Sequence, residues 1–182
     1  EFLVSAKQLG ATIASREARL IYGGAKVGLM GCIADTVLSQ GSEVIGITRF
    51  DGYATQVVVP EVQVFARPPE MAATLAAGFP AVFLTAHYAL MELCRLRSGM
   101  KILVHSAAGG VGGALTQIAR VQGCDVVGVV GSSHKVEAAR GHGATEVIDK
   151  SSVDLWPAAE RFAPEGYDVV LDANGIETLG ES

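Results

Sequence analysis

Short apolar runs alternate with helical periods along the second half of the chain. Each run is nearly continuous in Val, Ile and Leu, which is typical of strands buried on both faces of a parallel sheet. The strands are predicted at 101–106, 125–130, 145–149 and 167–172, and the helices between them at 111–122, 134–141 and 155–162. This alternation predicts an α/β fold, a Rossmann-like parallel sheet with helices on both faces.

The first half has a different pattern. Residues 19–47 contain an apolar run ending in two glycines, a helical period and a second apolar run, so a βαβ unit is predicted there. Residues 52–65 are rich in Val with Pro60 among them, which favours antiparallel or edge strands. The parallel sheet is therefore expected to follow a βαβ unit and a short β segment.

One uncharged stretch, residues 71–91, is long enough to span a bilayer. Gly78 and Pro80 interrupt its middle, and polar residues lie along it. Because proline breaks the interior of a helix, we expect two buried helices joined at Pro80 and no contact with a membrane.

Composition narrows the function classes. Apolar residues make up 49% of the 182 residues, too many for a disordered chain. A net charge of −5 argues against nucleic acid as a partner, because phosphate backbones require a basic face. The widely spaced Cys32, Cys94 and Cys124 predict buried free thiols, with neither a metal cluster nor a disulfide framework. With no signal-peptide pattern visible, a cytoplasmic location is expected.

A glycine-rich segment, HSAAGGVGGALTQIA, lies between a predicted strand and a predicted helix at residues 105–119. Aligned to the dinucleotide pattern G-x-G-x-x-G, it has Ala107 at the first position, Gly109 at the second and Gly112 at the third. Gly109 would let the backbone approach a pyrophosphate, and Gly112 would let the helix pack close to the strand. A purely structural turn is the alternative. The N–H groups expected to face the anion are those of Gly110, Val111 and Gly112.

The segment after the next strand bears on the cofactor. An NAD site has Asp or Glu near this point, and the sequence Gly-Ser-Ser-His-Lys at 131–135 contains neither. Ser132, Ser133 and Lys135 instead suit the 2′-phosphate of NADP(H). A serine helix cap followed by a solvated lysine is a second interpretation, and it is compatible with the first.

Residues 48–182 resemble a known family. The segments GYATQVVVPEVQVF, FLTAHYALMEL, ILVHSAAGGVGGALTQIA, GATEVID and YDVVLDANG resemble the zinc-independent quinone oxidoreductases and polyketide enoyl reductases of the medium-chain dehydrogenase/reductase superfamily. The resemblance implies hydride transfer from NADPH to a quinone or another activated alkene or carbonyl. It places the nicotinamide-side threonine on Thr85 and the 2′-phosphate lysine on Lys135. It implies no metal, and it assigns no catalytic residue.

Residues 1–47 resemble a different family, the LOG-type phosphoribohydrolases. The family's YGGG-x-x-GLMG motif is matched by YGGAKVGLMG at 22–31, with Ala25 in place of a glycine. The family's downstream PGG-x-GT-x-x-E motif is absent, so its hydrolase chemistry is not expected. A second phosphate loop is a hypothesis for Gly23, Gly24, Gly28 and Gly31.

Three functional hypotheses follow. The first is an NADPH-dependent reductase acting on a small molecule and impaired by truncation; the second is a non-catalytic nucleotide-binding chimera or fragment; the third, least favoured, is a phosphoribohydrolase. The expected parts are a LOG-like unit at 1–47, a remnant of reductase barrel strands at 48–69 and an NADP-binding domain at 70–182. An exposed sheet edge would invite self-association into a homo-oligomer.

Overall fold

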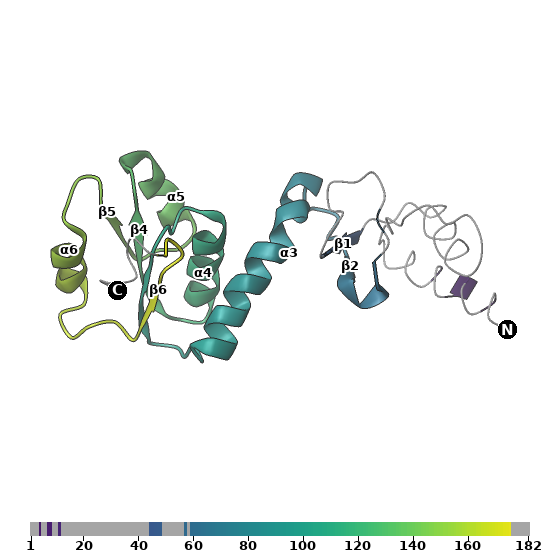
Figure 1. Ribbon diagram of the computed structural model, residues 1–182, viewed down its shortest axis with the longest axis horizontal. Helices are drawn as coiled ribbons and strands as arrows, with labels where there is room; N and C mark the ends of the chain where they lie inside the picture. Colours follow the sequence, from purple (N-terminus) through teal and green to yellow (C-terminus); the bar gives the residue numbers. More distant parts are fainter. Residues whose placement is uncertain are drawn as a thin grey trace. The chain divides into compact units, whose positions relative to one another are not determined.

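The computed structural model describes residues 44–48, 57 and 59–175, together with Val4, Lys7, Gln8 and Ala11 (Figure 1). The chain divides into two compact units, Glu1–Ala81 and Val82–Ser182. Most of the predicted βαβ unit lies outside the described residues.

The second unit contains a four-stranded parallel sheet in the order β5-β4-β3-β6. Its strands are β3 (Lys101–Val104), β4 (Asp125–Val130), β5 (Glu146–Asp149) and β6 (Val169–Leu171). Its helical segments are α4 (Gly110–Val121), the 3₁₀ turn η3 (Ser133–Lys135), α5 (Val136–Gly141) and α6 (Leu155–Phe162). The predicted Rossmann-like α/β fold is confirmed, with boundaries that differ from the prediction by up to two residues.

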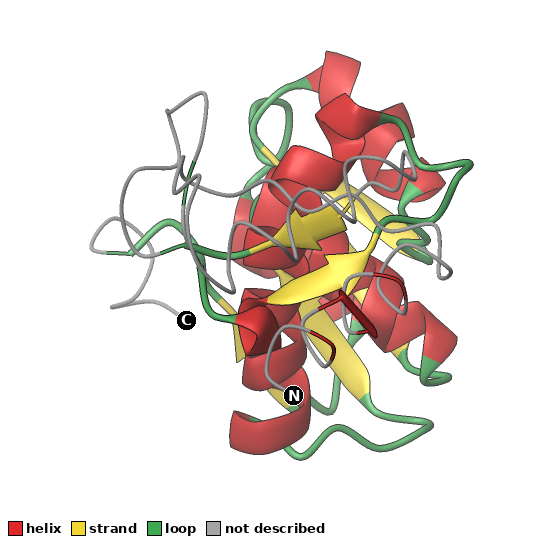
Figure 2. Ribbon diagram, turned by 90° about the vertical axis from the view of Figure 1, so that its right-hand side faces the viewer, coloured by secondary structure: helices red, strands yellow, loops and turns green. Residues whose placement is uncertain are grey.

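Each face of the sheet has its own core. Ile102 and Val104 of β3 pack with α4 and α5 on one face, whereas Leu103 packs with Ala158 and Ala159 of α6 on the other. This alternation follows from the strand period of two, which points successive side chains to opposite faces. Figure 1 shows α4 and α5 on one side of the sheet and α6 on the other, and Figure 2 shows the strands with helices beside them.

The prediction of two helices joined at Pro80 is wrong. A single helix, α3 (Ala73–His87), runs through Pro80 and is followed by a π-helical turn, η2 (Tyr88–Leu93). Proline removes one backbone hydrogen bond from a helix interior and clashes with the preceding turn, which costs about 3 kcal/mol. The apolar face of η2 offsets part of that cost, because Leu90 is fully buried in the core.

The segment Ala73–Leu93 is long and apolar enough to cross a membrane: an 18-residue window within it has a mean hydropathy of 1.3, and 22% of that window is buried. Core helices of soluble proteins reach the same length and hydropathy, so this observation is weak evidence for a membrane span. That the chain does not contact a membrane stays a prediction.

In the first unit, β1 (Val44–Gly46) pairs antiparallel with β2 (Val64–Ala66), which follows the 3₁₀ turn η1 (Glu61–Gln63). The antiparallel strand expected within 52–65 therefore lies at its carboxyl end. Val44 and Ile45 are half-buried, not fully buried as a parallel core strand would be.

Two of the three cysteines lie in the described residues, and both are free thiols. Cys124 is buried, as expected, and donates a hydrogen bond to the carbonyl of Arg97 at 3.2 Å. Cys94 is only half-buried. Burial raises the pKa of both thiols, which keeps them protonated and weakly nucleophilic.

Candidate functional site

The glycine-rich loop connects β3 to α4 at the carboxyl end of the sheet. Ser106 starts the turn with a φ of 53°, in the left-handed region that few residues other than glycine adopt. The N–H of Gly109 then donates to the Ser106 carbonyl at 2.7 Å, and the N–H of Ala107 donates to Val129 of β4 at 3.0 Å. The turn is therefore both tight and anchored to the neighbouring strand.

Gly112 lets α4 begin close to this turn. A Cβ atom placed on Gly112 would overlap the carbonyl oxygen of Ser106 and would lie 2.7 Å from its carbonyl carbon. The predicted role of Gly112 in close helix–strand packing is thus supported by the backbone geometry.

The first turn of α4 presents backbone donors. Gly109 is its N-cap, and the N–H of Gly113 donates to the Gly109 carbonyl at 2.7 Å. The three N–H groups before it precede the first intrahelical bond and have no helical carbonyl to bind. A helix amino terminus of this kind attracts anions through these donors and through the helix dipole. The donors are those of Gly110, Val111 and Gly112.

His142 holds the loop from the carboxyl end of α5, a role that the sequence did not predict. Its Nδ1 lies 3.0 Å from the carbonyl oxygen of Ala107. Its ring also occupies the space beside Gly113, where an added Cβ would lie 2.6 Å from two ring atoms. Ala107 is fully buried. Its N–H bonds to Val129 and its carbonyl contacts His142, so both backbone polar groups of Ala107 are held.

The strand order reverses direction between β3 and β6, and polar groups meet there. Ser106 Oγ donates to Asn174 Oδ1 at 2.6 Å, across 68 residues of sequence. Asp172 accepts hydrogen bonds from the N–H groups of Asn174 and Gly175, at 2.7 and 3.2 Å. Open α/β sheets bind their ligands at such a switch point, outside the carboxyl ends of the strands. Asn174 was not among the predicted site residues.

Thr85 lies on α3, which passes beside the glycine loop. A Cβ on Gly110 would be 3.3 Å from Val82 Cγ1, so this part of α3 faces the start of α4. Thr85 is one turn further along the helix than Val82 and shares its face. Its side chain is exposed. That Thr85 lies on the nicotinamide side of a bound cofactor stays a prediction.

The residues predicted to bind the 2′-phosphate lie together after β4. Ser132 is the N-cap of η3 but makes no side-chain capping bond, and Lys135 is exposed. Ser133 Oγ donates to Asp149 Oδ2 at 2.5 Å. A carboxylate therefore does lie beside these residues, although the segment 131–135 contains none. The carboxylate comes from β5, whose Asp149 pairs in register with Val130 of β4.

Asp149 carries a negative charge at neutral pH. Hydrogen bonds from Ser133 and from the hydroxyl and N–H of Ser151 lower its pKa, and the nearby His134 adds to this effect. Asp149 thus forms a local turn with Ser151, and its contact with Ser133 joins it to the segment after β4.

His105 is packed in the core. It is fully buried and its ring lies 6.1 Å from that of Trp156, edge to face. Burial lowers the pKa of His105, Asp172 raises it and Lys150 lowers it further, so burial sets the net direction. A neutral, buried ring of this kind serves packing better than proton transfer.

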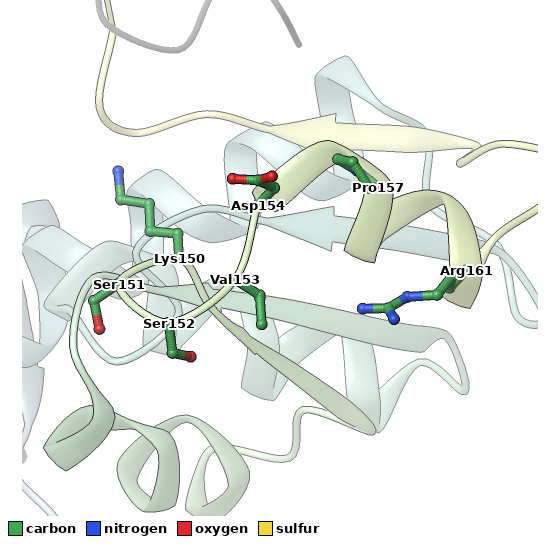
Figure 3. Close-up of a pocket in the computed structure, with 7 residues that line it drawn as sticks. All are labelled: Lys150, Ser151, Ser152, Val153, Asp154, Pro157 and Arg161. Atoms are coloured by element: carbon green, nitrogen blue, oxygen red, sulfur yellow. The ribbon is translucent and has the colours of Figure 1, made fainter.

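A polar hollow of about 610 Å³ lies beside the β5–α6 connection (Figure 3). Arg161 extends from α6 towards Val153, and the Asp154 carboxylate points towards the side on which Lys150 lies. The hollow is open to solvent. Its lining residues are Lys150, Ser151, Ser152, Val153, Asp154, Pro157 and Arg161.

The proposed second phosphate loop, Gly23, Gly24, Gly28 and Gly31, lies outside the described residues, as does most of the LOG-like segment, so these stay predictions. Among the residues that the structure describes, no group of three or more His, Cys, Asp or Glu side chains could hold a metal ion.

Comparison with known proteins agrees with this architecture. A family model described as "Zinc-binding dehydrogenase" matches residues 110–182. The human synaptic vesicle membrane protein VAT-1 homolog-like is 35% identical over 148 residues, covering 80% of this chain and 35% of that protein.

Two solved structures extend the comparison. The quinone oxidoreductase of Thermus thermophilus, also solved with NADPH, matches with a TM-score of 0.65 and 32% identity, over 74% of this chain and 44% of that one. The CurK enoyl reductase matches with a TM-score of 0.69 and 36% identity, over 75% of this chain and 41% of that one.

The resemblance to the medium-chain dehydrogenase/reductases is confirmed. The four-stranded unit has the fold of their nucleotide-binding domains, and NADPH, the cofactor expected from the sequence, is the one named for the Thermus structure. The chain spans less than half the length of the relatives it matches.

Proposed function

We propose that this chain carries the NADPH-binding part of a zinc-independent reductase, which transfers hydride to a quinone or to another activated alkene or carbonyl. One observation carries the proposal: the glycine loop follows β3, the strand at which the sheet order reverses, and its Gly112 lets α4 begin close to the Ser106 backbone. The non-catalytic nucleotide-binding module remains the second candidate.

The residues present fit a dinucleotide. The first-turn N–H groups of α4 would bind the pyrophosphate, with Gly109 giving the backbone access to it. Lys135, Ser132 and Ser133 would bind the 2′-phosphate, and Thr85 would lie on the nicotinamide side. When bound, NADPH supplies the hydride. The residues described here orient the cofactor.

Binding the cofactor does not by itself provide a site for the hydride acceptor. Hydride transfer needs the acceptor and the nicotinamide held at about 3–3.5 Å, which takes side chains on both sides of the cofactor. Binding and turnover therefore have to be measured separately.

The test combines a fluorescence titration with NADPH and an assay of NADPH consumption with 9,10-phenanthrenequinone. Binding with consumption supports a reductase. Binding without consumption would favour the non-catalytic module, and no binding would refute both.

Lys135→Ala tests the cofactor assignment. Losing a charged hydrogen bond to phosphate costs about 1.5–3 kcal/mol, so NADPH binding should weaken by about tenfold or more and NADH binding should change little. Arg140→Ala is a matched control, because it removes one exposed positive charge from α5, where Arg140 pairs with Glu137. Equal losses of NADPH and NADH in the Lys135 variant would contradict a 2′-phosphate role.

A further inference from the structure

Asp149 occupies the position where the predicted 2′-phosphate site meets the neighbouring strand. β4 and β5 run parallel, so the segments that follow them meet at the same edge of the sheet. Ser133 follows β4, and its hydroxyl is held by the Asp149 carboxylate at 2.5 Å. Ser151 fixes that carboxylate from the other side through its hydroxyl at 2.6 Å and its N–H at 3.0 Å.

This arrangement puts two anions in competition for one donor. A serine hydroxyl donates a single hydrogen bond, and Ser133 already donates its proton to Asp149. A 2′-phosphate bound by Ser133 would have to take this hydrogen bond from Asp149, and it would then lie about 5 Å from a carboxylate that has lost its donor. At that separation, like charges repel even in a solvent-like dielectric.

Positive charge at the same edge acts in the opposite sense. Lys135 ends the 3₁₀ turn that contains Ser133, and Lys150 follows Asp149 directly. The Lys150 stem lies near the end of β4, since a Cβ on Gly131 would be 3.8 Å from Lys150 Cε. The site therefore combines two cations that attract a phosphate with one carboxylate that repels it.

A ribose hydroxyl has the opposite relation to this carboxylate. It is a hydrogen-bond donor, and an Asp or Glu near this point of the fold accepts from the 2′-hydroxyl in sites for NAD. Asp149 can serve as such an acceptor, although it belongs to β5 and not to the end of β4.

We propose that Asp149 is a specificity-determining residue that opposes the 2′-phosphate, so that the site discriminates only weakly between NADPH and NADH. The inference rests on the proposed function, because it assumes that Ser133 and Lys135 face the adenosine ribose of a bound dinucleotide.

The experiment measures the dissociation constants of NADPH and NADH by fluorescence titration, for the full chain and for Asp149→Asn, at one fixed salt concentration. Asparagine keeps an acceptor for the Ser151 turn while removing the charge. We expect the ratio Kd(NADH)/Kd(NADPH) to rise about 3- to 10-fold, mainly through tighter NADPH binding.

Asp154→Asn is the matched control. It removes the same charge five residues further along, from a carboxylate that lines the polar hollow. It should leave the ratio unchanged. Asp149→Ser is a second variant in case the first folds poorly, and it should raise the ratio in the same way.

The outcomes separate the two proposals. If both dinucleotides bind and the ratio stays the same or falls in the Asp149 variants, the inference is overturned and the proposed function stands. An equal rise with Asp154→Asn would also overturn it, because the effect would then be one of general charge. If neither dinucleotide binds the unaltered chain, the proposed function fails, and this inference with it.

Discussion

Replacing Gly112 by alanine should destabilise the second unit and weaken cofactor binding together. The new methyl group would overlap the Ser106 carbonyl oxygen and lie 2.7 Å from its carbon and 3.0 Å from the His105 oxygen. Favourable carbon contacts lie at about 3.5–4.0 Å, so α4 would have to move away from the loop. All three obstructing atoms belong to the backbone and cannot rotate aside.

The magnitude follows from two opposing effects. Overpacking costs about 1–3 kcal/mol, and rigid backbone neighbours place this case near the upper end of that range. Alanine also restricts the unfolded chain, which restores about 0.4–1 kcal/mol. The net loss is about 2 kcal/mol, which lowers the Tm of a unit of this size by about 8–16 °C.

The assay is urea unfolding followed by circular dichroism, paired with an NADPH titration. Gly141→Ala is the control in the same unit, because nothing lies within 4 Å of its added Cβ; it should stabilise the unit by about 0.4–1 kcal/mol. NADPH affinity should fall at least tenfold in the Gly112 variant alone. If the two variants unfold alike and bind NADPH equally, the close approach of α4 to the loop is not required.

Two further predictions concern single contacts. Tyr167 donates a hydrogen bond to Ala159 at 2.9 Å, and burial followed by the charge of Asp125 raises its pKa to about 12 from the ordinary 10. The folded state therefore keeps a proton that the unfolded state loses, and this stabilisation, complete below pH 10, disappears between pH 10 and 12. In urea unfolding, the free energy of unfolding of the unaltered chain relative to Tyr167→Phe should fall in that pH window. A difference that stays constant with pH would contradict the raised pKa. His142→Ala should lower the free energy of unfolding by about 1 kcal/mol and weaken NADPH binding several-fold, because it releases the Ala107 carbonyl. His142→Asn should recover part of the stability and part of the NADPH affinity in the same two assays. Unchanged NADPH binding in the alanine variant would show that the loop keeps its shape without the ring.

Local sequence was enough to predict most of the second unit. The apolar runs at β3, β4 and β5 are long enough to predict buried strands. The glycine loop is predicted between β3 and α4, and the structure has it there. These features depend on neighbouring residues only: a strand period, a helix start and a turn that excludes side chains.

Pro80 shows where a local rule fails. Proline predicts an interruption because it removes a hydrogen bond, yet α3 continues through it into η2. The sequence around Pro80 does not record that Ala86 and Leu90 further along are buried against the sheet. Tertiary packing of that kind outweighs a cost of about 3 kcal/mol.

The candidate site divides in the same way. Contiguous residues were enough to suggest the phosphate loop and the serines and lysine after β4, because each is a single short run of the chain; their roles stay predictions. The fold alone placed Asn174 against Ser106 and Asp149 against Ser133, pairs separated by 68 and 16 residues. Parallel strands bring their carboxyl ends to one edge regardless of sequence distance, so the partners of a site residue are set by strand order.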